Sequence, residues 1–98
     1  MAIIIVNDLP ADVTAEEYKQ VSEIIEPQGA PDGLLFHTGF MKGDHIQTVD
    51  AWESREKFEA FREARLTPAI MRVAGERMAQ AGPPPEPEEH QPLDLVTP

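Results

Sequence analysis

The feature of this 98-residue chain that most constrains its fold is a two-residue turn, Gly43-Asp44, between two apolar runs. Glycine adopts positive φ without steric cost, so a tight β-hairpin often has glycine as its first loop residue. We therefore predict antiparallel strands over residues 33–41 and 45–53. The loop length also fixes the register, with Lys42 facing His45 and each further pair one residue along on both strands.

In this register, several uncommon side chains fall on one face of the hairpin. His37 lies opposite Asp50, and Leu35 lies opposite Trp52. A carboxylate beside an imidazole orients the ring and raises its basicity, so His37 is the candidate acid/base and Asp50 its orienter. Trp52 is the candidate wall of a substrate pocket, and Gly39 leaves room for a ligand. The alternative is a structural His–Asp pair beside a core tryptophan, which is the commoner arrangement.

The remaining elements follow from capping signals and apolar spacing. The isoleucine-rich run at 2–7 predicts a strand covered on both faces. Thr14 and Glu17 have the spacing of a capping box and open a helix that ends before Gly29. Ser54 caps a second helix, and Thr67-Pro68 predicts a fresh cap and a new helix start.

This order of elements predicts an α+β, ferredoxin-like βαββαβ protomer: an antiparallel sheet with its helices on one face. The second strand is apolar on both sides, however, because Phe36 and Phe40 share one face while Leu35 and Met41 share the other. A sheet of this kind, with helices for one face only, needs a second sheet to cover it. We therefore expect a homodimer.

The end of the chain differs from the body. Six of the ten prolines follow Gly82, together with four acidic residues and no lysine or arginine. We assign residues 1–81 to the ferredoxin-like domain and 82–98 to an acidic, proline-rich tail. A disordered tail is the common alternative, but residues 90–96 alternate well enough to form an edge strand, where proline is tolerated.

Composition excludes several classes of function. The net charge of −10, without a basic patch, argues against nucleic acid as a partner. The absence of cysteine removes disulfides and thiolate metal sites, and three scattered histidines predict no metal site. No apolar run approaches the roughly 20 residues that span a bilayer. The N-terminus lacks the basic region of a signal peptide, so we expect a cytoplasmic protein.

Three further residues are weaker candidates for a substrate pocket. Tyr18 lies among the apolar positions of the first helix and could send its hydroxyl to the same cavity, although core packing is the commoner role. Arg65 could supply a cation for an anionic substrate, although a solvated or ion-paired arginine is the default. Asn7 ends the first strand, as a turn residue or as a pocket amide.

The segment from Val49 to Phe58, VDAWESREKF, resembles the strand-to-helix junction of dimeric α/β-barrel proteins. These include the antibiotic biosynthesis monooxygenase group and, more closely, short uncharacterised bacterial proteins with a Trp-Glu-Ser core. The resemblance covers most of residues 2–80 in element order, but only the junction from Trp52 to Phe58 is specific. It implies that two protomers pack sheet on sheet into a barrel, each with a pocket between its sheet and helices.

The resemblance also implies a range of activities. Some members are cofactor-free monooxygenases of polycyclic aromatic compounds, and others degrade heme with a strand-one Asn, a junction Trp and a helix His. Asn7 and Trp52 match the first two, but the His position falls near Arg62, so we expect no cofactor. The leading hypothesis is a monooxygenase-like enzyme, or an isomerase or cyclase, for a small hydrophobic or aromatic molecule. The alternatives are a non-catalytic ligand-binding or regulatory dimer, and a purely structural partner protein.

Overall fold

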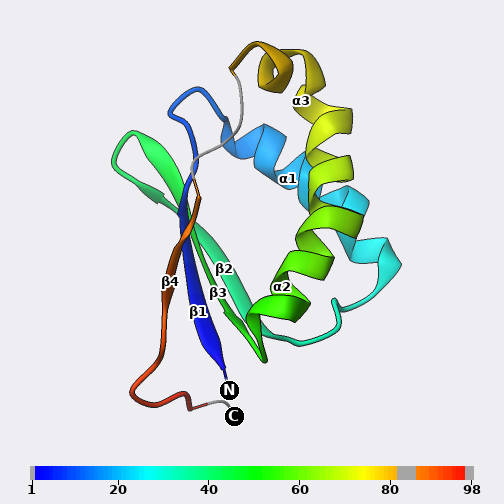
Figure 1. The fold of residues 1–98 in the computed structure, drawn as a ribbon. Coiled ribbons are helices and arrows are strands. Elements are labelled where there is room, and N and C mark those ends of the chain that lie inside the picture. The colour runs from blue at the N-terminus through cyan, green and yellow to red at the C-terminus, as the bar shows by residue number, and fades with distance from the viewer. Residues whose placement is uncertain (1, 82–85, 97–98) are drawn as a thin grey trace.

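The computed structural model describes residues 2–81 and 86–96, which form one antiparallel sheet and three helices. The helices all lie on one face of the sheet, and the other face has no helix over it (Figure 1). The strands have the spatial order β2-β3-β1-β4, with bounds β1 Ile3–Asp8, β2 Leu34–Lys42, β3 His45–Trp52 and β4 Glu88–His90. The helices are α1 Ala15–Ile25, α2 Arg55–Phe61 and α3 Thr67–Ala81. This confirms the predicted α+β, ferredoxin-like fold.

Helix α1 begins where the capping box predicts it. The Thr14 hydroxyl accepts a hydrogen bond from the backbone N–H of Glu17 at 3.1 Å, and the Glu17 carboxylate accepts one from the backbone N–H of Thr14 at 3.0 Å. The helix passes into a short 3₁₀ turn at Glu26–Gln28. It stops at Gly29, whose φ of 91° suits glycine.

The α-helix α3 begins at Thr67, as predicted, but the predicted fresh cap at that residue is wrong. Thr67 has helical backbone angles, φ −59° and ψ −45°, and helix α2 continues into α3 through a π-helical turn at Arg62–Leu66. Proline has no N–H to donate to the carbonyl four residues back, and its ring crowds that carbonyl. The wider π turn accommodates this defect at Pro68 without a break in the chain of helices. Ser54 caps α2 as predicted, since its hydroxyl accepts from the backbone N–H of Lys57 at 3.2 Å.

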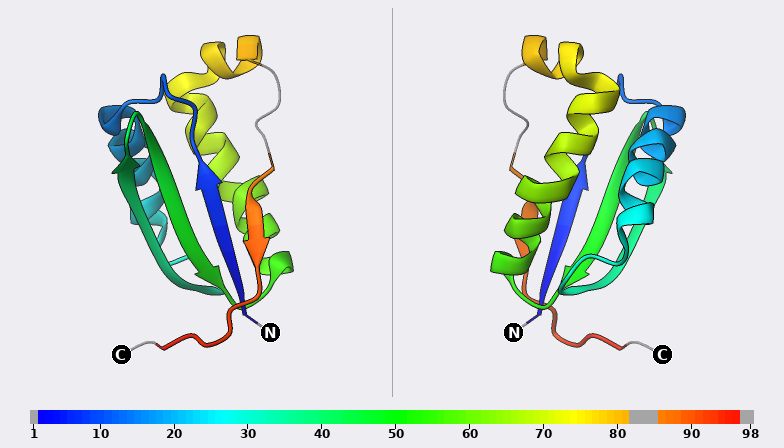
Figure 2. Two further views of the ribbon diagram at one scale, coloured as in Figure 1. Left: turned by 90° about the vertical axis from the view of Figure 1, so that its left-hand side faces the viewer. Right: turned by 90° about the vertical axis from the view of Figure 1, so that its right-hand side faces the viewer.

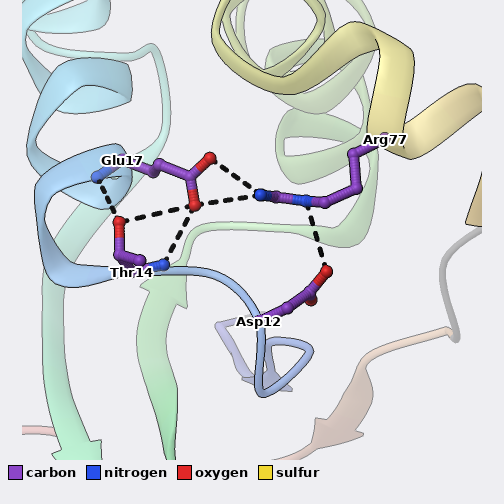
Figure 3. A network of polar contacts seen from close by, with 4 residues as sticks. All are labelled: Asp12, Thr14, Glu17 and Arg77. Carbon is purple, nitrogen blue, oxygen red and sulfur yellow. Dashed lines mark hydrogen bonds and ion pairs between the residues drawn. The ribbon is translucent and has the colours of Figure 1, made fainter.

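A charged network joins the start of α1 to α3 (Figure 3). The guanidinium of Arg77, on α3, lies between two carboxylates from the other end of the chain. It contacts Glu17 at 2.9 Å and Asp12 at 3.3 Å. The same Glu17 carboxylate accepts a hydrogen bond from the backbone N–H of Thr14 in the capping box. One acidic side chain therefore stabilises the start of α1 and also links α1 to α3.

The hydrophobic core fills the space between the sheet and α2. Trp52, with 1% of its surface exposed, is the largest fully buried side chain. The rings of Phe58 and Phe61 pack on it, with centroid distances of 5.8 and 5.2 Å. Ile3 and Ile5 complete the cluster from β1. The core therefore packs around the end of β3, next to the candidate dyad formed by His37 and Asp50.

The hairpin has the predicted register over most of its length. Gly43 has φ 67°, no residue other than glycine has a positive φ among the described residues, and Lys42 pairs with His45. One pair differs, because a β-bulge between Leu34 and Phe36 places Leu34, not Leu35, opposite Trp52. The extra residue moves Leu34 onto the core, while Leu35 is 40% exposed.

The last strand forms earlier in the chain than predicted. It covers Glu88–His90 and pairs antiparallel with β1, and residues 91–96 are not part of a strand. Two ion pairs attach it to the helical layer: Glu89 with Arg55 at 3.1 Å and Glu86 with Arg62 at 3.6 Å. Figure 2 shows β4 at the sheet edge, with the chain after it passing the end of β1. The start of the predicted acidic, proline-rich tail, residues 82–85, lies outside the described residues.

Among the residues that the structure describes, no helix has the length and apolar character needed to cross a membrane.

Candidate functional site

His37 and Asp50 form the pair that the hairpin register predicts. They are direct partners across β2 and β3, and Nδ1 of His37 is hydrogen-bonded to a carboxylate oxygen of Asp50. The pair is asymmetric, because the side chain of His37 is 42% exposed and that of Asp50 only 13%. A mostly covered carboxylate therefore holds an imidazole that remains open to solvent.

Tyr18 reaches the other side of the imidazole from helix α1. Its hydroxyl lies 2.6 Å from Nε2 of His37, and the two rings are nearly parallel, with an angle of 17° and centroids 6.3 Å apart. The space above Gly39 is filled by this ring: a Cβ at that position would lie 2.7 Å from Cζ of Tyr18 and closer still to its hydroxyl. Gly39 therefore admits Tyr18, not the ligand that the sequence suggests.

Trp52 is the fourth residue in this series of polar contacts, and it reaches Asp50 from the hydrophobic core. Its indole N–H donates a long hydrogen bond, 3.4 Å, to the second carboxylate oxygen of Asp50. Its ring is buried among the phenylalanines of the core. Trp52 therefore contacts the candidate site through its hydrogen bond to Asp50. The four residues thus form one linear series, Tyr18–His37–Asp50–Trp52.

The surroundings of this series raise the pKa values of two of its members, His37 and Tyr18. The hydrogen bond that His37 donates to the Asp50 carboxylate raises the pKa of His37 above its ordinary 6.5, against a smaller opposing effect of burial. Burial and, second, the charge of Asp50 raise the pKa of the Tyr18 phenol above its ordinary 10. At neutral pH the phenol keeps its proton, while the imidazole is close to the range in which it gains and loses one.

Asn7 lies in the next row of the same sheet face. It pairs with Thr48 on β3, and Thr48 pairs with Gly39 on β2. Thr48 is the buried polar residue of the described core, at 9% exposure. Sequence analysis did not single out Thr48, although the hairpin register already places it opposite Gly39. The polar side chains of Asp50, Thr48 and Asn7 therefore occupy two adjacent rows of the helix-facing side, between the apolar cluster at Trp52 and the buried Ile46.

Arg65 is occupied elsewhere. It lies in the π turn, and its guanidinium donates to the backbone carbonyls of Ile25 at 2.9 Å and Gly29 at 2.7 Å. It also lies over the ring of Phe61, 5.6 Å from the centroid. The structure therefore places this arginine beyond the end of α1, where it binds two backbone carbonyls, and not beside His37.

Two hollows in the surface lie near α2. One of about 250 Å³ is bounded by Arg55, Arg62 and the ion-paired tail, and one of about 360 Å³ is bounded by Pro31, Phe61 and Arg65. None of the four residues of the linear series lines either hollow. In the described part of the chain, no group of three or more His, Asp or Glu side chains is placed to hold a metal ion.

Comparisons with known proteins place the fold. No family model matches the sequence, and no curated protein sequence matches it. Among solved structures, Rv0793 from Mycobacterium tuberculosis is similar over 98% of this chain and 97% of its own, with 19% identity and a TM-score of 0.63. NE2512 from Nitrosomonas europaea, a protein of unknown function, is similar over 99% and 92%, with 17% identity and a TM-score of 0.66.

A third similar structure is the heme-degrader MhuD from Mycobacterium tuberculosis, with two hemes bound in its active site. It is 24% identical, and the similarity covers 99% of this chain and 100% of MhuD, with a TM-score of 0.55. This chain has their ferredoxin-like fold. Identities at this level establish a shared architecture, whereas function has to be argued from the site.

Proposed function

We propose that this protein is a cofactor-independent acid/base enzyme of the dimeric α/β-barrel type, acting on a small hydrophobic or aromatic molecule in the manner of the antibiotic biosynthesis monooxygenases. One observation carries the proposal: the linear series Tyr18–His37–Asp50–Trp52, in which a mostly covered carboxylate orients a half-exposed imidazole. His37 is the acid/base in this proposal, and Asp50 fixes its orientation and tautomer.

The chemistry needs only a base with a suitable pKa in a site that limits water. Removal of a proton from an electron-rich aromatic substrate gives an anion that reacts with dioxygen or rearranges. Because the pKa of His37 is raised above its ordinary value, the imidazole can accept that proton near neutral pH. Asn7 and Thr48, in the adjacent row, supply polar groups on the same face.

Heme is a less suitable partner for this chain. The histidines are residues 37, 45 and 90, so none lies on a helix. At the position where the resemblance would place a helix ligand, Arg62 is ion-paired with Glu86 and lies over the ring of Phe58. Trp52 is covered by core side chains and offers no open face to a porphyrin. We therefore propose no role for heme.

The uncovered face of the sheet supports the proposed homodimer. Phe36 and Phe40 alternate along β2 with His37, which faces α1, so they lie on the opposite face, with 38% and 43% of their surfaces exposed. No helix lies over that face of the sheet (Figure 1). A second copy packed sheet on sheet would bury both rings. Sedimentation of Phe40→Lys should show a monomer at concentrations where the parent chain is a dimer. Met41→Lys, next along β2 but on the opposite face, is the matched control; a monomeric parent chain would contradict the proposal.

The alternative is a non-catalytic dimer that binds a small ligand. The hollow of about 360 Å³ beside Pro31 and Phe61 favours it, since it is of a size that small ligands occupy and is separate from the dyad. In that case binding would depend on residues such as Phe61 and not on His37. The two proposals therefore make opposite predictions for variants of the dyad.

Variants of the dyad test the proposed activity. A set of hydroxyaromatic compounds is first screened for quenching of Trp52, the only tryptophan, and bound compounds are then assayed for turnover. His37→Gln and Asp50→Asn should each lower turnover by roughly 10²–10⁴-fold, the usual contribution of general acid/base catalysis. His45→Gln is the control, since His45 also contacts carboxylates, those of Asp8 and Asp44. Turnover that survives both dyad changes would refute the assignment, and binding without turnover in the parent chain would support the alternative.

A further inference from the structure

We propose that Tyr18, and not His37, is the residue that exchanges a proton with the substrate. The His37–Asp50 pair takes up a proton from Tyr18 and later returns it. This inference rests on the proposed acid/base function and changes which atom meets the substrate. It adds Tyr18 as a catalytic residue and Gly39 as the position that lets its side chain reach the imidazole.

The first argument is that both nitrogens of His37 are already engaged. A neutral imidazole offers one donor and one acceptor. Nδ1 is paired with Asp50, which can only accept when ionised, so Nδ1 is the donor in the neutral ring. Nε2 then accepts from the Tyr18 hydroxyl, 2.6 Å away. No ring nitrogen is left for a substrate, whereas a phenol oxygen that donates one hydrogen bond can still accept another.

The second argument is that the fold holds the phenol in place. Tyr18 stands in the first turn of α1, where its backbone N–H donates to the carbonyl of the cap residue Thr14 at 3.0 Å. Its ring lies against the backbone of β2 at Gly39, too close for any side chain there. Glycine inside a strand lowers stability and favours other backbone conformations. The absence of a side chain at Gly39 thus leaves the space that the Tyr18 phenol occupies between α1 and β2.

The proton balance of the step is simple. A substrate O–H or activated C–H gives its proton to the Tyr18 oxygen while the phenol gives its own proton to Nε2 of His37. The products are the substrate anion and an imidazolium, which Asp50 stabilises through Nδ1. The reverse transfer restores the starting state. Because burial and Asp50 hold the pKa of Tyr18 above its ordinary value, no phenolate accumulates, and the phenol acts as a relay and not as a standing base.

The test uses 4-nitrophenol, a small hydroxyaromatic probe whose coloured phenolate reports its own ionisation. Binding is measured by quenching of Trp52 and ionisation by absorbance, with the full chain near neutral pH. The parent chain should increase the ionised fraction of bound probe. Tyr18→Phe, which keeps the ring, and Gly39→Ala, which displaces the hydroxyl from His37, should both abolish the increase. His45→Gln should leave it unchanged.

The outcomes separate this inference from the proposed function. An increase that persists or grows in Tyr18→Phe would show that the probe meets Nε2 directly; the relay would then be wrong and the acid/base function would stand. No binding, or no increase in the parent chain, would count against both proposals. If Tyr18→Phe changes the fold by circular dichroism, Gly39→Ala decides the question.

A second measurement needs no ligand. Tyr18 is the only tyrosine, so the phenolate absorbance of the chain titrates this side chain alone. In the parent chain the neutral His37 accepts from the phenol at alkaline pH, which holds the proton on Tyr18. His37→Gln should shift the midpoint of the titration to lower pH, while His45→Gln should not. Identical curves for the parent chain and His37→Gln would contradict the link between the two rings.

Discussion

Glu17 and Tyr18 are neighbours in the first turn of α1, yet their side chains enter two separate polar networks. Glu17 faces α3, where it meets Arg77 and, through it, Asp12 (Figure 3). Tyr18 faces the sheet, where it meets His37. Each network includes a residue from the first turn of α1, and the two have a similar number of residues and comparable distances between their polar atoms. They can therefore be compared within one small domain.

The networks differ in how their surroundings shift the pKa values. Arg77 lowers the pKa of Glu17, and Glu17 in turn raises that of Arg77, so both groups move further from neutrality and keep a fixed charge. In the second network, Asp50 raises the pKa of His37 from a value already near neutrality. The first network can hold two helices together but cannot exchange protons near neutral pH. This difference supports the second network as the candidate active site.

The largest expected effect concerns the support of the second network. Trp52→Ala removes the largest fully buried side chain and the donor to Asp50, and should lower the free energy of unfolding by about 3–5 kcal/mol. Urea denaturation followed by circular dichroism measures it. Trp52→Phe keeps most of the packing but not the N–H, so it should cost less. An unchanged midpoint for Trp52→Ala would show that the network does not depend on the core.

An intermediate effect is expected for the first network. Thr14→Ala removes the side-chain acceptor of the α1 capping box and should cost about 1 kcal/mol of unfolding free energy. Thr14→Ser, which keeps the hydroxyl, is the matched control and should be close to the parent chain. Because the networks are separate, the titration of Tyr18 should stay unchanged. A shift in that titration would mean that the two networks are coupled through the helix turn.

The sequence predicts the second network better than most of the tail and the helix junctions. A two-residue turn with glycine first determines the register, and the register brings His37 opposite Asp50 without any knowledge of the rest of the fold. The same logic fails for Leu35, because a β-bulge inserts one residue and nothing in the local sequence marks it. Local chemistry thus predicts pairs close to the turn and loses accuracy beyond the first irregularity.

The contacts that the sequence could not predict are those between distant elements. The fit of Tyr18 over Gly39 depends on how α1 crosses β2, and the use of Arg65 on the carbonyls at the end of α1 depends on the π turn that contains it. Thr67-Pro68 has the local pattern of a capped helix start, but the backbone is helical through Thr67 and a π turn joins α2 to α3 there. These outcomes are set by tertiary packing, which no spacing rule contains.

The smallest expected effect is a pH dependence that belongs to the second network alone. The native state raises the pKa of His37 above 6.5, so it binds the proton more tightly than the unfolded chain does. The resulting stabilisation is complete below the unfolded value and is lost as the pH rises through the folded value. The difference in unfolding free energy between the parent chain and His37→Gln should therefore decrease from about pH 6 to about pH 8.

The effect should be smaller than that of Thr14→Ala, because the side chain of His37 is 42% exposed and solvent screens its pairing. Asp50 and Tyr18 are the titratable groups that contact this imidazole, and Tyr18 stays neutral over the range. His45, whose pKa is also raised by its carboxylate partners, is present in both chains and cancels in the difference. Glu17→Gln, in the first network, should give a difference that is flat between the same two pH values, since the pKa of Glu17 is lowered. A difference that is flat for His37→Gln but sloped for Glu17→Gln would reverse the comparison, with the proton-exchanging group on the α3 side of the helix.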